Sequence, residues 1–228
     1  MSDVMVISPH PDDGELGMGG AISKFVEEGL DVVMVDLTDG EPTPYGNPEL
    51  RAKETASASA AMGVTQRINL GLPNRELQPT IEARKQLAAA IRQFRPRLLF
   101  TPYFQDAHPD HVVASELSDA ARFTAKLTKT DMPHSPHYPK QIIYYFCSHL
   151  KLAEGPSFVL DISSCQQKKR AALEAYQSQF YTGRDIPGEI CQIIVDRDRY
   201  FGTRIGVEAA EPFFVHEPVG LKTIASLL

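Results

Sequence analysis

"SPHPDDGELGMGG", residues 8–20, directly follows the apolar run at 4–7. A second stretch of the same character, "DAHPDH" at 106–111, follows the apolar run at 97–102. Each stretch is rich in histidine and carboxylates and is expected to lie between a buried strand and a helix. In doubly wound α/β folds, ligands bind beyond the carboxyl ends of the strands. Both stretches are therefore expected at one site.

Short apolar runs alternate with amphipathic stretches through the first half of the chain, which predicts a parallel sheet with crossover helices. The predicted strands cover 4–7, 30–37, 67–70, 97–102, 141–147 and 157–162. The predicted helices cover 21–28, 48–62, 80–94, 108–125, 164–179 and 196–206. We expect one α/β domain over 1–228, with a Rossmann-like, doubly wound, mostly parallel sheet flanked by helices.

Composition narrows the function classes. The chain has 228 residues, a net charge of −6 and 23 scattered Lys and Arg residues, which argues against a nucleic-acid partner. It shows no apolar run of the roughly 18 to 20 residues that span a bilayer, and no signal-peptide pattern. We therefore expect a cytoplasmic protein with no membrane partner. The three cysteines lack C-x-x-C spacing, so neither disulfides nor a zinc knuckle are expected.

The two stretches supply side chains that bind metals and transfer protons: His10, Asp12, Asp13, Glu15, Asp106, His108, Asp110 and His111. Imidazole with carboxylate is the ligand set of a catalytic zinc or of a similar divalent metal such as Fe²⁺. Such a metal lowers the pKa of its water towards about 7 and supplies hydroxide without a serine or cysteine nucleophile. Of the adjacent Asp12 and Asp13, one is expected to bind the metal and the other to accept the proton of the water.

Three alternative interpretations apply to these residues. A single H-P-D can be a turn whose aspartate caps the next helix, but two copies in equivalent positions favour a shared site. The glycines at 14–20 suggest a nucleotide enzyme using NAD or S-adenosylmethionine, yet no G-x-G-x-x-G is present, and the glycines are predicted to allow close packing of a helix on the sheet. A non-catalytic sugar-binding or metal-storage protein would have no use for Asp12 and His108.

"SPHPDDGELGMGG" resembles the P-H-P-D-D-x-E motif of the LmbE-like, or PIG-L, zinc-dependent N-acetylglucosamine deacetylases, and "HPDH" resembles their second motif. The likeness extends to "ELRAKETASASAAMGV", "INLGLPNREL" and "ALEAYQSQF". Within the family, the chain is most similar to the branch that deacetylates N-acetylglucosaminyl-malate in bacillithiol biosynthesis. The resemblance implies that His10, Asp13 and His111 bind zinc, that Asp12 is the general base, and that His108 stabilises the oxyanion or protonates the leaving amine.

The same resemblance implies that Asp110 orients His108, that Arg51 and Glu54 lie near the sugar, and that the protein forms homo-trimers or hexamers. The expected substrate is a small amino-sugar conjugate with an acidic aglycone, or another N-acetyl amino sugar.

The residues themselves suggest further contacts with such a substrate. A malate aglycone needs a cation, and Arg51, Arg75 and Arg184 are candidates because a guanidinium can bind a carboxylate through two hydrogen bonds. Gln179 is a candidate polar contact. Either Asp12 or His108 could protonate the amine. The polar loop at 128–140 has a length that suits an active-site rim or a subunit contact.

Overall fold

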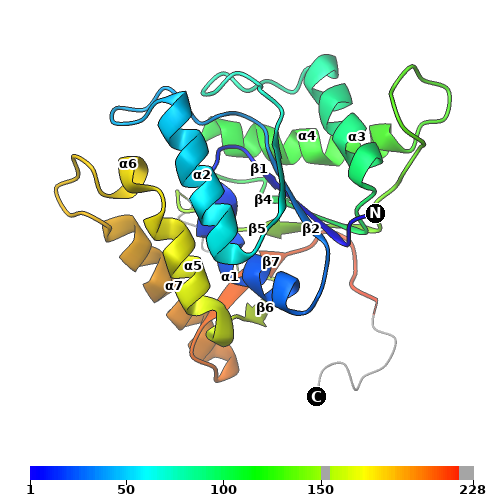
Figure 1. Cartoon of the computed structure of the whole chain (residues 1–228). Helices are drawn as coiled ribbons and strands as arrows, with labels where there is room; N and C mark the ends of the chain where they lie inside the picture. Colours follow the sequence, from blue (N-terminus) through cyan, green and yellow to red (C-terminus); the bar gives the residue numbers. More distant parts are fainter. Residues whose placement is uncertain (150–154, 221–228) are drawn as a thin grey trace.

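A seven-stranded sheet forms the centre of the protein in the computed structural model, which describes residues 1–149 and 155–220 (Figure 1). The strands are β1 (Val4–Ser8), β2 (Val32–Asp36), β3 (Gln66–Asn69), β4 (Leu98–Pro102), β5 (Gln141–Tyr145), β6 (Phe158–Asp161) and β7 (Ala210–Phe214). Their order in the sheet is β3-β2-β1-β4-β5-β7-β6. The first five strands are parallel, and β7 runs antiparallel to both of its neighbours. The predicted Rossmann-like, mostly parallel sheet is confirmed.

Helices cover both faces of the sheet (Figure 1). They are α1 (Asp13–Glu27), α2 (Pro48–Met62), α3 (Ile81–Phe94), α4 (Pro109–Ala125), α5 (Gln166–Glu174), α6 (Gln177–Phe180) and α7 (Glu189–Ile205), with a 3₁₀ turn at Ser163–Cys165. α3 and α4 pack on one face, and α1, α2, α5 and α7 on the other. None of the helices within the described ranges is long and apolar enough to cross a bilayer.

Burial on both faces explains why the central strands are continuous apolar runs rather than alternating ones. In β1, Val4 and Val6 pack in the core on the α1 side, whereas Met5 and Ile7 pack in the core on the α3 side. The parallel strands thus place their carboxyl ends, and the two predicted motifs, along one edge of the sheet.

Three helices and one strand differ most from the prediction. α1 begins at Asp13 rather than at residue 21, and α7 at Glu189 rather than at 196. The helix predicted at 164–179 is divided between α5 and α6. β7 was not predicted, because Pro212 stands in its middle and proline is rare in paired strands. Its pairing with β5 involves only Phe213 and Phe214.

The loop at 128–140 lies at the amino ends of the strands, opposite to the motifs. The Nε2 of His137 lies 2.6 Å from the carbonyl oxygen of Pro96, which precedes β4. The buried guanidinium of Arg92, on α3, donates to the carbonyl oxygens of Met132 and His134. No residue of this loop lines the cavity at the two motifs, so the expectation that it could form a rim of the active site is wrong.

Candidate active site

The two motifs meet because β1 and β4 are paired neighbours, so the segments that follow them leave the sheet side by side. They border a cavity of about 530 Å³. Of the predicted site residues, the cavity is lined by His10, Asp12, Asp13, Arg51, Arg75, His108, His111 and Gln179. Asp110 and Glu54 are buried behind this lining. Sequence reasoning did not single out Thr43, Asn74 or His149, which also line the cavity.

His10, Asp13 and His111 form a compact donor set whose candidate ligand atoms all lie within 4.8 Å of one another. The two oxygens of Asp13 are shared between the imidazoles: Oδ2 lies 2.9 Å from Nδ1 of His10, and Oδ1 lies 3.2 Å from Nε2 of His111. Two imidazoles and a carboxylate are a common ligand set for a catalytic divalent metal, which keeps a further position for water. The residues present therefore fit such a metal.

Asp106 orients His111 from the second motif. Its Oδ2 lies 3.0 Å from Nδ1 of His111, and its Oδ1 accepts a hydrogen bond of 2.8 Å from the backbone amide of His108. A carboxylate on one ring nitrogen fixes the tautomer and leaves the other nitrogen for a metal. The available signal was an acid five residues before a histidine in the same short loop.

Charge pairing controls the protonation of both histidines. Burial lowers the pKa of His10, but hydrogen bonds to Asp110 and Asp13 outweigh it and raise this pKa to about 9. Burial likewise opposes the charged form of His111, yet the charge of Asp13 raises its pKa well above the ordinary value. A metal ion must displace protons from imidazoles that it binds, so metal binding at this cluster is coupled to proton release.

Asp12 occupies a strained backbone position at the start of α1, with φ 134° and ψ −28°. Side chains other than glycine rarely adopt this region, and such strain is often found at functional sites. Its Oδ2 accepts a hydrogen bond of 2.8 Å from Nη2 of Arg51. Burial raises the pKa of Asp12 to about 7, against the opposing charge of Arg51. A carboxylate with such a pKa is suited to accept a proton near neutral pH.

His108 precedes α4 and faces the other histidines, with ring centroids 4.9 Å from His10 and 4.7 Å from His111. Its Nδ1 accepts a hydrogen bond of 3.2 Å from the backbone amide of Asp110. Burial, assisted by the charges of His111 and His10, lowers the pKa of His108. The ring is therefore favoured in its neutral form.

The side chain of Asp110 does not orient His108 in the way the resemblance suggested. Its Oδ2 lies 3.0 Å from Nε2 of His10 and accepts a hydrogen bond of 2.8 Å from the amide of Arg75. Its Oδ1 accepts a longer bond, 3.3 Å, from the amide of Leu77. Asp110 thus connects His10 to the segment at 75–77, and its link to His108 passes through the backbone.

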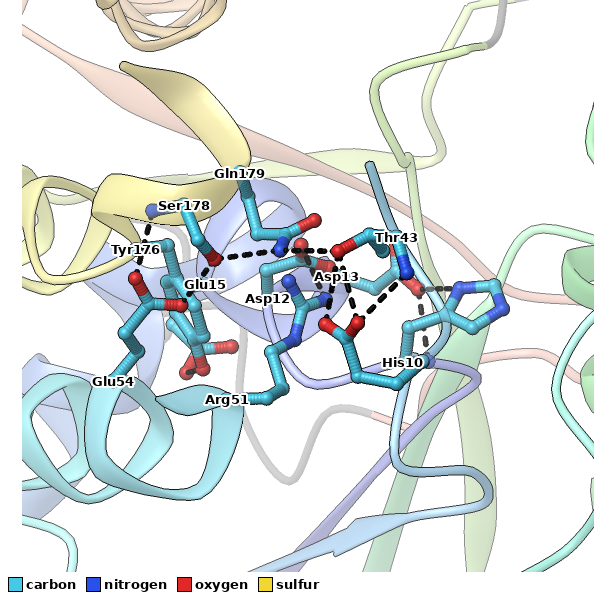
Figure 2. Close-up of polar contacts among 12 residues, drawn as sticks. His10, Asp12, Asp13, Glu15, Thr43, Arg51, Glu54, Tyr176, Ser178 and Gln179 are labelled. Atoms are coloured by element: carbon cyan, nitrogen blue, oxygen red, sulfur yellow. Dashed lines mark hydrogen bonds and ion pairs between the residues drawn. The ribbon is translucent and has the colours of Figure 1, made fainter. Parts of the chain in front are cut away.

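Glu54 supports the cavity wall from behind, as Figure 2 shows. Its two oxygens accept bonds of 2.7 Å from the amide and the hydroxyl of Ser178. The adjacent Gln179 donates to Oγ1 of Thr43 over 3.1 Å (Figure 2). Arg51 lines the cavity, whereas Glu54 holds the segment that presents Gln179 to it.

Two further guanidiniums border the cavity. Arg75 donates from Nη2 to the carbonyl oxygen of Pro42, and Arg184 donates from Nε to the carbonyl oxygen of Gln179 over 2.9 Å. Both side chains are largely exposed to the solvent of the cavity mouth. They place positive charge on the lining of the cavity, which also holds the carboxylates of Asp185 and Glu189.

Glu15, the last acid of the first motif, belongs to a buried network rather than to the metal cluster. Its Oε1 accepts a bond of 2.6 Å from Nη1 of Arg67. It also accepts a bond of 2.8 Å from the hydroxyl of Tyr176 (Figure 2). Arg67 also binds both oxygens of Asp36. The network ties α1 to β2, β3 and the end of α5.

Comparisons with known proteins agree with this geometry. The family model described as "PIG-L: GlcNAc-PI de-N-acetylase" matches residues 5–122. Diacetylchitobiose deacetylase of Thermococcus kodakarensis is 30% identical over 192 residues, covering 78% of this chain and 70% of the relative. The probable N-acetyl-α-D-glucosaminyl L-malate deacetylase 2 of Bacillus anthracis is 26% identical over 193 residues, covering 78% and 82%. The crystal structure of the conserved protein TT1542 from Thermus thermophilus superposes with a TM-score of 0.90 at 39% identity, covering 98% and 99%.

Proposed function

Because the chain belongs to the PIG-L family of de-N-acetylases, and is thus a deacetylase acting on amides, we propose that it deacetylates an N-acetylglucosamine conjugate with a small acidic aglycone. N-acetylglucosaminyl-malate is the proposed substrate. The observation that carries the proposal is the cluster of His10, Asp13 and His111 beside a buried Asp12 in one cavity.

His10, Asp13 and His111 are the proposed metal ligands, and zinc is the proposed metal. The same nitrogen and oxygen donors also suit Fe²⁺, so metal content distinguishes the two. When bound, the metal polarises the acetamide carbonyl and lowers the pKa of its water. Asp106 and Asp110 hold the two imidazoles in place.

Asp12 is the proposed general base and accepts the proton of the attacking water, with its carboxylate held by Arg51. His108 donates a hydrogen bond to the carbonyl oxygen as negative charge develops on it. The sugar nitrogen must gain a proton before the C–N bond breaks. Asp12, which holds a proton after the attack, is the proposed donor; His108 is the alternative donor only as an imidazolium, a form that its lowered pKa disfavours.

The rim of the cavity supports an acidic aglycone. Arg75 and Arg184 place cationic groups where the part of the substrate beyond the sugar would lie, and a guanidinium binds carboxylates well. Gln179 and Arg51 are proposed to contact the sugar. The relative from Bacillus anthracis is named for a malate conjugate, which agrees with this substrate class. The name of the Thermococcus relative instead indicates a neutral disaccharide, diacetylchitobiose, which is the competing candidate.

The decisive experiment measures free amine released from N-acetylglucosaminyl-malate, diacetylchitobiose and N-acetylglucosamine by the zinc-loaded protein. Asp12→Asn is assayed beside Asp131→Asn, whose carboxylate is 84% exposed and lies 3.3 Å from Nζ of Lys85. The malate conjugate should give the highest kcat/KM, and Asp12→Asn should retain metal but lose about 10² to 10⁴ in kcat. Preference for diacetylchitobiose refutes the acidic aglycone, and no release from any sugar refutes the deacetylase of amino sugars.

Assembly into a homo-trimer or hexamer remains part of the proposal. Light scattering of the purified protein, coupled to size-exclusion chromatography, measures the mass of the assembly against the 25.2 kDa chain. A monomeric mass would refute it.

A further inference from the structure

Helix α1, which begins at the metal cluster, is broken at Met18, where φ is −151° and ψ is 27°. In an unbroken helix the amides of Gly20 and Ala21 would donate to the carbonyls of Leu16 and Gly17. Here these two amides donate to the carboxylate of Glu211, on β7, over 2.9 and 2.7 Å. The break therefore leaves a short first segment, 13–17, that is separate from the rest of α1.

The carbonyl side of the break is satisfied by Arg197, on α7. Its Nη2 donates to the carbonyl oxygen of Leu16 over 2.7 Å and lies 3.4 Å from that of Gly17. Its Nη1 donates to the carbonyl oxygen of Phe146, just after β5, over 2.9 Å. A cation at the carbonyl end and an anion, Glu211, at the amide end match the partial charges of the two helix ends.

Asp198 and Lys169 connect these two residues into one charged network. Oδ1 of Asp198 lies 3.2 Å from Nη2 of Arg197, and Oδ2 lies 2.5 Å from Nζ of Lys169. Lys169 also donates to Glu211 over 2.7 Å. Lys169, Asp198 and Glu211 are each at most 3% exposed. Removing one partner from such a buried network is costly, because it leaves an uncompensated charge.

The short segment carries the groups at which the chemistry occurs. Asp13 is its first residue, and Asp12 immediately precedes it. The amide of Leu16 donates to the carbonyl oxygen of Asp12 over 2.8 Å, and the side chain of Leu16 lines the cavity. Gly17 is in close contact with Tyr145, because a Cβ there would lie 2.3 Å from that ring. A residue that holds the end of this segment therefore also influences the positions of Asp12 and Asp13.

We propose that Arg197 is a positioning residue of the active site. By binding the carbonyl of Leu16 together with that of Phe146, it fixes the segment 13–17 and thereby the carboxylates of Asp12 and Asp13. The inference rests on the proposed function for its effect on turnover, whereas its effect on metal binding depends only on the donor set.

The test compares Arg197→Met with Arg199→Met, a control on the same helix whose side chain is 59% exposed and lies 3.8 Å from Asp196. Arg197→Lys keeps the charge but has one nitrogen in place of the guanidinium fork. For each protein we would measure the Zn²⁺ dissociation constant by chelator competition, the visible spectrum of the Co²⁺ form, the thermal midpoint, kcat and KM. Arg197→Met should weaken Zn²⁺ binding and lower kcat by about tenfold each, with an altered Co²⁺ spectrum and little change in KM. Arg197→Lys should be intermediate, and Arg199→Met should match the wild type.

A lower thermal midpoint with wild-type Zn²⁺ affinity, Co²⁺ spectrum and kcat would show that Arg197 only stabilises α7, which overturns the inference. If Arg197→Met does not fold, Arg197→Lys decides by the same criteria. If the wild type binds metal but releases amine from no sugar, the proposed function fails, and the Zn²⁺ and Co²⁺ measurements still test Arg197.

Discussion

Replacing Arg51 by methionine should move the acid limb of the pH–rate profile. Arg51 donates to Asp12 over 2.8 Å, and burial already raises the pKa of that carboxyl to about 7. An adjacent arginine lowers an aspartate pKa by about 1 to 3 units, so its loss should raise that of Asp12 by about 2. At pH 7.5 the ionised fraction would fall from about three quarters to about 3%, a loss of about 25-fold in base-dependent rate. Raising the pH to about 10 should restore most of it.

The assay is kcat/KM from pH 5.5 to 10 for the wild type, Arg51→Met and Arg51→Lys, which keeps the positive charge. A bound metal lowers the pKa of Asp12 in all three proteins, so the loss at pH 7.5 is smaller than 25-fold in the loaded enzyme. The acid limb of Arg51→Met should still lie about 2 pH units above that of the wild type. A uniform loss of rate across the pH range, with the acid limb unmoved, would refute the argument and assign Arg51 to substrate binding alone.

Three further predictions follow from other contacts. Asp106→Asn removes the carboxylate on Nδ1 of His111 and should weaken Zn²⁺ binding by about 10- to 100-fold in chelator competition; unchanged affinity would contradict its orienting role. Because the pKa values of His10 and His111 are raised, Zn²⁺ binding at pH 7 should release about two protons and should weaken as the pH falls below about 9. Calorimetry in buffers of different ionisation enthalpy counts the released protons, and a count near zero would be inconsistent with the geometry. Glu211→Gln should lower the free energy of unfolding, measured in urea, by about 3 kcal/mol, because it leaves Lys169 without one of its buried anionic partners. The control Glu208→Gln, at an exposed position, should have little effect, and equal effects of the two variants would speak against the network.

The parallel half of the fold was predictable because strands buried on both faces appear as apolar runs between turn residues. β7 was not predictable, since its sequence "AEPFF" holds a glutamate and a proline. Glu211 is buried because it meets Lys169 and two amides of α1, and these partners lie more than 40 residues away in the sequence. The local sequence pattern does not show that residues so far away in the chain will pair with a buried glutamate.

The start of α1 was missed for a related reason. Gly17 and Gly20 lower helix propensity, yet a Cβ at Gly17 would lie 2.3 Å from Tyr145 and one at Gly20 would lie 2.5 Å from Ile162. The predicted close packing on the sheet is thus confirmed for Gly14 and Gly17, whereas Gly19 packs against Lys169 of α5 and Gly20 against Ile162 beyond β6. Tertiary contact outweighs propensity at these positions.

The candidate site was predictable as a set of residues but not as a set of contacts. The strand pattern brings the histidines and carboxylates of both motifs to two neighbouring strand ends, and the resemblance to the deacetylase family selects His10, Asp13 and His111 among them. Motif spacing does not encode the directions of side chains. It therefore could not predict that Asp110 contacts His10 or that Glu54 binds Ser178 behind the cavity.

The cavity is built from two parts of different origin. Its floor, with the histidines and aspartates, is attached to the ends of buried strands. Gln179 and Arg184 instead come from the connection between α5 and α7, and Glu189 is the first residue of α7; neither contributes a strand to the sheet. Changes in that connection leave the strand ends where they are. Substrate preference can therefore evolve separately from the catalytic chemistry. Exchanging residues 179–190 between relatives is a direct way to change the substrate preference while keeping the catalytic residues.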